Sequence, residues 1–309
     1  MKALVMRGPG QFGVEEVPKP VCGDREVLVQ VQAVAICGSD PVLLAGGSLS
    51  DGLPGSLPHI AGHEGAGIIV EEAMAIQPGD PYGDNYMRIA LETLEYMVQH
   101  APKDIKVNPP ICMAPFTVCA QLCGIGDFCA NTLEDPDMVQ AMLDVATETC
   151  IRYMKACEKV MGGPLHHLLL SDDLSSFLSV RGFEEWVLPT YEKIFKEFPN
   201  SQKWLHNDAK ANHLAKAIAD AGFQAWQYAP SVPSEHAMAE TGGRVSLLGG
   251  LHPVELQSMS AQQTYDVCME KPRSFGGNNK FVLGVGGSVN QIPVENLMAM
   301  FHAADDYKL

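Results

Sequence analysis

Residues 202–222, QKWLHNDAKANHLAKAIADAG, predict a strand that runs directly into a helix. The apolar strand ends in His206, Asn207 and Asp208, and the helix begins near Asn212. Gly222 marks its end, as glycine often does just past a helix. In an α/β fold, the residues that follow a strand lie at the rim where binding and catalytic groups gather. His206 and Asp208 are therefore the first candidates for a functional site.

Strands and helices alternate in the same way through residues 73–309. Helical spacing and helix-boundary residues indicate helices at 85–100, 135–161, 183–198 and 293–303, with a polar loop after residue 124. Short apolar runs indicate strands at 106–113, 165–170, 203–206, 224–228, 245–248 and 281–285. This alternation predicts an α/β fold with a parallel sheet.

The type of sheet follows from where polar residues and glycines stand. Polar residues recur just past predicted strand ends, at Asp172, His206, Asp208 and His252. No Gly-x-Gly-x-x-Gly motif lies between a predicted strand and a predicted helix, which disfavours a dinucleotide-binding doubly wound sheet. A (β/α)8-type barrel fits better. Because six strands are two short of eight, the prediction is an incomplete TIM barrel.

Residues 1–72 have a different pattern. Strands are expected at 1–6, 27–36 and 65–70, with Pro and Gly between them and no helical periodicity. The predicted organisation is a partial β-rich segment, residues 1–72, followed by a barrel domain, residues 73–309.

Composition and charge narrow the classes of function. Of the 309 residues, 46% are hydrophobic and 19% are charged, which is typical of a globular protein. The net charge is −16 and Lys and Arg form no cluster, which disfavours nucleic acid or an anionic membrane as a partner. No apolar run reaches the length of about 18 residues that suggests a membrane span. Nine cysteines without a CxxC pair, and an N-terminus unlike a signal peptide, predict reduced thiols in the cytoplasm.

The N-terminal segment carries three stretches in a familiar order: MKALVMRGPG, EVLVQVQAVAICGSD and PHIAGHEGAG. With them it resembles the GroES-like first domain of medium-chain, zinc-type alcohol dehydrogenases. The resemblance implies a catalytic zinc near Cys37, His63 and Glu64, because thiolate, imidazole and carboxylate are zinc ligands. It ends near Glu71, and no nicotinamide-binding domain follows, so hydride transfer is not expected. A partial β-module with a free cysteine and an exposed histidine is the alternative.

A second resemblance covers about residues 78–309. It is carried by NPPICMAPFTVCAQLCG, HHLLLSDDLSSFLSVRGFEEWVLPTYEKIFKEF, WLHNDAKANHLAKAIADAGF, RVSLLGGLHPVEL and FVLGVGGSVNQIPVENLMAM. These stretches resemble the uroporphyrinogen decarboxylase superfamily of TIM barrels. That resemblance implies one of two chemistries: decarboxylation of the acetate side chains of uroporphyrinogen, or methyl transfer that involves a corrinoid protein and coenzyme M or tetrahydrofolate.

Decarboxylation is disfavoured by the residues that the resemblance would require. The superfamily's early arginine motif and its Ser-Asp motif are missing, since the dehydrogenase-like segment stands in their place. Its tyrosine position falls at Gln121 and its last histidine position falls at Gly287. A substrate with eight carboxylates would also meet a protein of charge −16.

Methyl transfer agrees better, although not with a complete zinc site. The zinc-dependent members use His-x-Cys and a later Cys, and the matching positions here are His206, Asp208 and Gly287. Members without that zinc set use Asp or His to bind the pterin or to handle a proton, which His206, Asp208 and Asp172 could do. These three are the predicted catalytic residues. Predicted cofactor contacts are Gly286, Gly287, Gln121 and Asn207, although the two glycines could equally only make a turn.

The expected function is thus methyl transfer between a corrinoid protein and tetrahydrofolate or a thiol, with a corrinoid or tetrahydrofolate as cofactor and zinc possible. The expected partners are a corrinoid protein and a small methyl donor or acceptor. Two alternatives stay open. One is a decarboxylase-like protein that lacks the catalytic residues, and the other is a non-enzymatic, truncated fusion of two enzyme fragments.

Overall fold

The computed structural model describes residues 1–8, 10–21, 28–34, 59–60, 65–71, 76–83, 86–274, 280–286, 289 and 291–307. The chain divides into two compact units. One contains residues 1–77 and 120–128, and the other contains residues 78–119 and 129–309. None of the helices in the described ranges combines the length and the apolar character needed to cross a membrane.

Residues 1–77 of the first unit contain short strands, as the sequence predicts, and these strands pair in an antiparallel manner. Strand β1 (Lys2–Gly8) pairs with β2 (Gln11–Glu16) and with β4 (His59–Ile60), and β3 (Leu28–Val34) pairs with β5 (Gly65–Glu71). Strand β2 was not predicted. It follows a tight turn at Gly10, whose φ of 67° suits glycine, and an ion pair between Arg7 and Glu15 joins the two arms of the hairpin.

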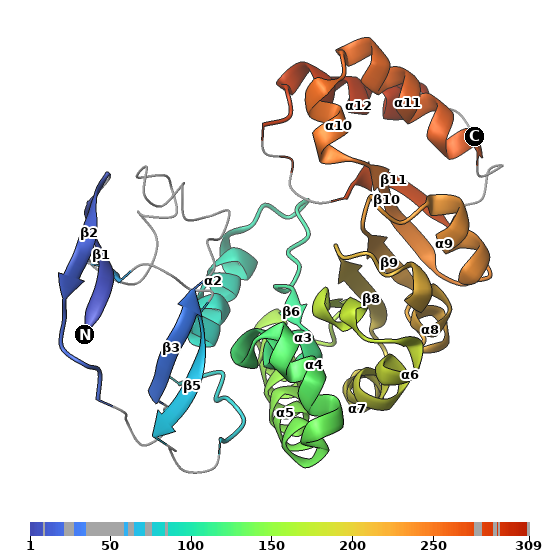
Figure 1. Cartoon of the computed structure of the whole chain (residues 1–309). Helices are drawn as coiled ribbons and strands as arrows, with labels where there is room; N and C mark the ends of the chain where they lie inside the picture. The colour runs from blue at the N-terminus through green and yellow to red at the C-terminus, as the bar shows by residue number, and fades with distance from the viewer. Residues whose placement is uncertain are drawn as a thin grey trace. The chain divides into compact units, whose positions relative to one another are not determined.

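The second unit contains a parallel sheet of six strands in the order β11-β10-β9-β8-β7-β6 (Figure 1). Their bounds are β6 Cys112–Met113, β7 His167–Ser171, β8 Gln202–Asn207, β9 Ala225–Tyr228, β10 Ser246–Leu251 and β11 Phe281–Val285. Each strand lies beside the one before it in sequence, whereas a doubly wound sheet would reverse its order at a switch point. Right-handed connections without a reversal place the helices on one face of the sheet. The mixed α/β prediction is confirmed. Within the described ranges, β6 and β11 each have one neighbour, so the sheet is open there and closure into a barrel is not seen.

Helix α5 (Pro136–Met161) shows how sequence sets the boundaries of an element. The Asp135 side chain accepts a hydrogen bond from the Met138 N–H at 3.2 Å, and Pro136 occupies the first turn. At the other end Gly162 adopts φ 75°, the left-handed conformation that closes many helices. Both boundaries agree with the predicted helix at 135–161.

The other α-helices in the described ranges are α2 Tyr86–His100, α3 Pro115–Cys123, α4 Ile125–Glu134, α6 Val180–Gly182, α7 Leu188–Glu197, α8 Ala215–Asp220, α9 Ser234–Glu240, α10 Pro253–Ser258, α11 Ala261–Ser274 and α12 Val294–Asp306. Between α6 and α7 the chain makes a π-helical turn, Phe183–Val187. Pro189 follows this turn and has no N–H with which to continue the ordinary helical ladder.

Two sequence predictions about the start of this unit are wrong. The strand expected at 106–113 is only Cys112–Met113, because Pro109 and Pro110 lack the N–H groups that a strand ladder uses. The polar loop expected after residue 124 is instead helix α4. Gly124, with φ 87°, separates α3 from α4.

Side chains on the six strands alternate between two faces, and this alternation positions the site. The face that we call outer is the buried one. It carries Leu170, Leu205, Trp226 and Leu247, which are in register on neighbouring strands and almost fully buried. A second apolar cluster stabilises the C-terminal helices; its buried members are Leu251, Leu256, Cys268, Ile292 and Ala303. The next residue along each strand points to the opposite, inner face.

Candidate functional site

One row of side chains crosses the inner face of the sheet. Successive strands pair these residues in register: Met113, Ser171, His206, Gln227, Leu248 and Val282. Ser171, His206 and Gln227 form a polar centre between apolar neighbours. All six are partly or largely exposed, in contrast to the buried outer face. This row, whose polar centre lies near the carboxyl ends of β7, β8 and β9, is the candidate site.

His206 makes two contacts that differ in length. Its Nδ1 lies 3.0 Å from Gln227 Oε1, and its Nε2 lies 3.6 Å from Asp208 Oδ2. The first is a hydrogen-bond distance and the second is too long for one. If the amide oxygen is the acceptor, Nδ1 carries a proton, and in the neutral imidazole the lone pair is then on Nε2. The imidazole is about one-fifth exposed, at 21%, so a small molecule can reach it.

Asp208 is the acidic neighbour of that lone pair. Burial raises its pKa, His206 opposes the increase, and the Asp173 carboxylate adds to it. Asp173 also accepts a hydrogen bond from the Asp208 backbone N–H at 2.6 Å. Asp173 was not singled out as a site residue in the sequence, although it directly follows Asp172.

Asp172 lies in a different environment from the one its prediction implied. It is fully buried, and its carboxylate accepts hydrogen bonds from the hydroxyls of Thr117, at 2.6 Å, and Tyr191. Burial raises the pKa of Asp172, and these hydroxyls partly offset that increase. Burial and the nearby Asp172 also hold the pKa of Tyr191 well above its usual value. The carboxylate that was predicted to be catalytic therefore joins structural elements together and does not face the inner row.

Asn207 completes that connection. It is buried, and its Nδ2 donates to the Asp172 carbonyl oxygen at 2.5 Å and to Ser176 Oγ at 2.9 Å. The Asp172 N–H in turn donates to the His206 carbonyl oxygen at 3.0 Å. Asn207 thus fixes the backbone between His206 and Asp208, while its own side chain faces away from the inner row.

The other predicted cofactor contacts are Gly286, Gln121 and Gly287. A side chain at Gly286 would meet the Pro230 ring at 2.8 Å, so close packing accounts for that glycine, and its N–H donates to the Leu251 carbonyl oxygen. Gln121 is exposed on α3, within the first unit. Gly287 lies outside the described residues, as do the three predicted N-terminal zinc ligands Cys37, His63 and Glu64.

The residues at the sheet do not fit the three-ligand zinc site of the zinc-dependent members. His206 and Asp208 supply two donor side chains, and the third matching position is Gly287, which has no side chain. In the part of the chain that the structure describes, no three His, Cys, Asp or Glu side chains converge as metal ligands. We therefore assign no step to zinc at His206.

A parallel sheet wound in one direction, with titratable side chains at its strand ends, defines an α/β protein whose candidate site lies at the carboxyl ends of strands β7 to β9. The family model described as uroporphyrinogen decarboxylase (URO-D) matches residues 64–307. The chain belongs to the uroporphyrinogen decarboxylase family.

Each of the two parts of the chain is similar in sequence to proteins of known name. A methylated-thiol–coenzyme M methyltransferase from Methanosarcina mazei is 27% identical over 201 residues, which are 64% of this chain and 52% of that enzyme. A sorbitol dehydrogenase from Bos taurus is similar in the N-terminal region, with 36% identity over 93 residues, 29% of this chain and 24% of that enzyme. The chain thus spans about half of the first relative and about a quarter of the second.

A solved structure supports the fold. A methyltransferase from Methanosarcina mazei superposes with a TM-score of 0.64 at 23% identity, covering 81% of this chain and 72% of that one. At this level of identity the likeness shows a common fold.

Proposed function

We propose that this protein is a methyltransferase that moves a methyl group between a corrinoid protein and tetrahydrofolate or a small thiol. The observation that carries the proposal is the partly exposed imidazole of His206, whose Nε2 lies 3.6 Å from the Asp208 carboxylate. The family and the likeness to a methylated-thiol–coenzyme M methyltransferase support the reaction class.

His206 acts as the proton acceptor in the proposed reaction. The corrinoid, when its protein docks, supplies a methyl group carried on cobalt. With a thiol acceptor, Nε2 takes the S–H proton while the sulfur forms a bond to the methyl carbon. The bond between the methyl group and its carrier breaks, and its electron pair stays on the carrier. A proton returns from the same atom when the leaving group is a pterin nitrogen.

Asp208 and the buried pair behind it support that step. The Asp208 carboxylate, 3.6 Å from Nε2, stabilises the imidazolium that forms. Asp172 and Asn207 are positioning residues in this proposal, because their hydrogen bonds fix the backbone that carries His206. Gly286, Gly287 and Gln121 stay proposed contacts for the corrinoid or folate, and Cys37, His63 and Glu64 stay proposed zinc ligands of the N-terminal segment.

The test is a methyl-transfer assay with methylcobalamin as the donor and 2-mercaptoethanol or tetrahydrofolate as the acceptor. Removing a proton acceptor costs about 100-fold or more in rate, so His206→Ala should lose most activity. His302→Ala is the matched control, since His302 is exposed on α12 outside the inner row. Equal rates for parent and His206→Ala would exclude the role of His206. No transfer by the parent with either acceptor would favour a non-enzymatic protein.

A further inference from the structure

Gln227 is a polar residue in an otherwise apolar strand. Strand β9 reads AWQY, and Trp226 and Tyr228 on either side of Gln227 are fully buried against the outer layer. The Tyr228 hydroxyl is further held by Ser234 Oγ at 2.5 Å. These two anchored aromatic residues fix the backbone so that the Gln227 side chain points to the inner face, directly beside His206.

The contact between Gln227 and His206 has a direction. Nδ1 lies at hydrogen-bond distance from Oε1, at 3.0 Å, whereas Nε2 is 3.6 Å from the nearest Asp208 oxygen. If the proton sat on Nε2, it would have no acceptor at hydrogen-bond distance in Asp208. If it sits on Nδ1, it has one in Gln227.

We infer that Gln227 is a positioning residue that holds His206 in the tautomer with the proton on Nδ1, and so presents the Nε2 lone pair toward Asp208 and the reacting groups. The tautomer of His206 is inferred from the distances alone, whereas the role of Gln227 in methyl transfer rests on the proposed function.

A neutral amide suits this role better than the residues closest to it in size. A carboxylate at the same place would also accept from Nδ1, but its charge would favour the imidazolium, which has no lone pair to take a proton. An apolar side chain would leave Nδ1 without an acceptor. Asp208 lies beside the imidazole and Asp173 lies beside Asp208, whereas Gln227 is neutral, so changing Gln227 changes the imidazole's partner without removing a charge.

The first experiment measures the tautomer itself, by ¹⁵N NMR of the histidine side chains in the full chain at alkaline pH. The His206 signals are assigned from their loss in His206→Ala. We expect the parent to show the proton on Nδ1, and Gln227→Leu to move most of it to Nε2. Gln202→Leu is the matched control. Gln202 lies on β8, on the same face as His206, and its side chain bonds to Trp204 and not to His206. A parent with its proton on Nε2, or a Gln227→Leu spectrum like that of the parent, would overturn the assignment.

The second experiment follows methyl transfer from methylcobalamin against pH. Loss of a residue that orients a histidine typically costs about 10- to 100-fold, so Gln227→Leu should fall by that factor. Gln227→Glu restores an acceptor oxygen and should recover the rate at high pH. The midpoint of its pH–rate profile should lie about one pH unit above that of the parent. A rate for Gln227→Leu equal to that of the parent would contradict the reaction part. If no variant and not even the parent transfers a methyl group, the proposed function fails while the NMR result still decides the tautomer.

Discussion

Asp172 places a buried carboxyl group where strands β7 and β8 end. Its carboxylate is the acceptor for two hydroxyls, those of Thr117 and Tyr191, and its carbonyl oxygen accepts from Asn207. Asp172→Ala would leave the hydroxyls unpaired and open a small cavity. We expect the free energy of unfolding in urea to fall by about 2–4 kcal/mol.

The control for that measurement is Asp305→Ala, since Asp305 is exposed near the end of α12. Its unfolding free energy should change by less than about 0.5 kcal/mol. A similar small change for Asp172→Ala would show that the buried carboxylate adds nothing to stability.

At this scale the sequence predicted where the site residues stand along the chain but not which way they face. The end of β8 at Asn207 agrees with the predicted strand. Asp172 and Asn207 were expected in the site, and both face the buried layer. Gln227 was missed because its nearness to His206 depends on the register of two strands, which a single sequence does not reveal. A glutamine between two aromatic residues was the available signal.

Among the elements, two glycines at the end of β11 test close packing: Gly284 lies within the strand and Gly286 directly follows it. A Cβ at Gly286 would lie 2.8 Å from two atoms of the Pro230 ring, whereas a Cβ at Gly284 would meet nothing within 4 Å. Gly286→Ala should therefore reduce the free energy of unfolding by about 1–3 kcal/mol. Gly284→Ala is the matched control and should be nearly neutral. Equal effects in thermal or urea unfolding would show that Pro230 moves aside freely.

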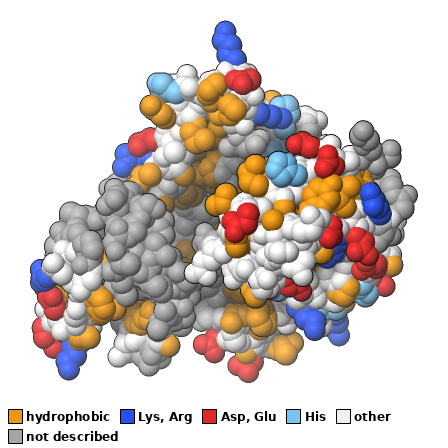
Figure 2. All heavy atoms as spheres, turned by 90° about the horizontal axis from the view of Figure 1, so that it is seen from above, with side chains coloured by type: hydrophobic (Ala, Val, Ile, Leu, Met, Phe, Trp, Pro, Cys, Tyr) orange, Lys and Arg blue, Asp and Glu red, His pale blue; other side chains and the backbone are white. Residues whose placement is uncertain are grey.

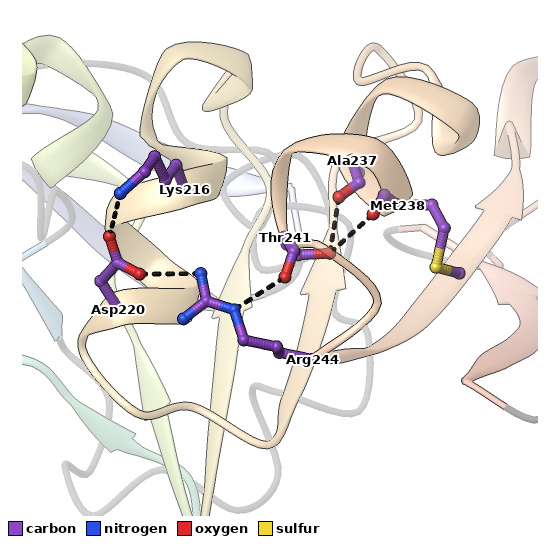
Figure 3. Close-up of polar contacts among 6 residues, drawn as sticks. All are labelled: Lys216, Asp220, Ala237, Met238, Thr241 and Arg244. Atoms are coloured by element: carbon purple, nitrogen blue, oxygen red, sulfur yellow. Dashed lines mark hydrogen bonds and ion pairs between the residues drawn. The ribbon is translucent and has the colours of Figure 1, made fainter.

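A network of polar contacts joins α8 to the turn before β10 (Figure 3). Asp220 accepts from Lys216 at 2.5 Å and from Arg244 at 2.7 Å, and Arg244 Nε donates to the Thr241 carbonyl oxygen. These hydrogen bonds hold the pKa of Asp220 below its usual value. A carboxylate with a lowered folded pKa stabilises the protein above its unfolded pKa, and that contribution disappears as the pH falls through the folded value.

We therefore expect Asp220→Asn to be less stable than the parent at pH 7 and equal to it once the pH is well below 3.8. Urea unfolding at both pH values measures the difference. Asp305→Asn should have the same free energy of unfolding as the parent at both pH values. A deficit in Asp220→Asn that persists unchanged in acid would show that the ion pairs are not its cause.

Elements with clear boundary residues were predictable, and those set by tertiary pairing were not. The helix at 135–161 has a capping aspartate, a proline and a terminal glycine, so local chemistry decides it. Strand β6 is two residues long because it exists only where Cys112 and Met113 pair with β7. The sequential strand order followed from the strand–helix alternation, but whether the sheet closes could not be read from it.

For the whole molecule, two resemblances meet in one chain, and each implies its own zinc chemistry. The sheet offers two donors, His206 and Asp208, while the proposed N-terminal set is Cys37, His63 and Glu64. We expect that any zinc found by metal analysis of the purified chain is lost in Cys37→Ser and kept in His206→Ala. The reverse result would place the metal at the sheet.

Charge also acts at this scale. The net charge is −16, and on the face shown in Figure 2 the Lys and Arg side chains are dispersed among acidic and apolar ones. A partner or substrate whose binding depended on a dense basic surface would find none among the described side chains on that face.

Transfer of a labelled methyl group shows whether the chain is a methyltransferase. The intact chain is incubated with cobalamin that carries a CD₃ group and with 2-mercaptoethanol or tetrahydrofolate, and the acceptor is analysed by mass spectrometry. We predict CD₃ on an acceptor at a rate that depends on the concentration of the parent protein and is at least about 100-fold lower with His206→Ala. Formation of the labelled product at the same rate with and without the protein would show that the chain does not catalyse methyl transfer.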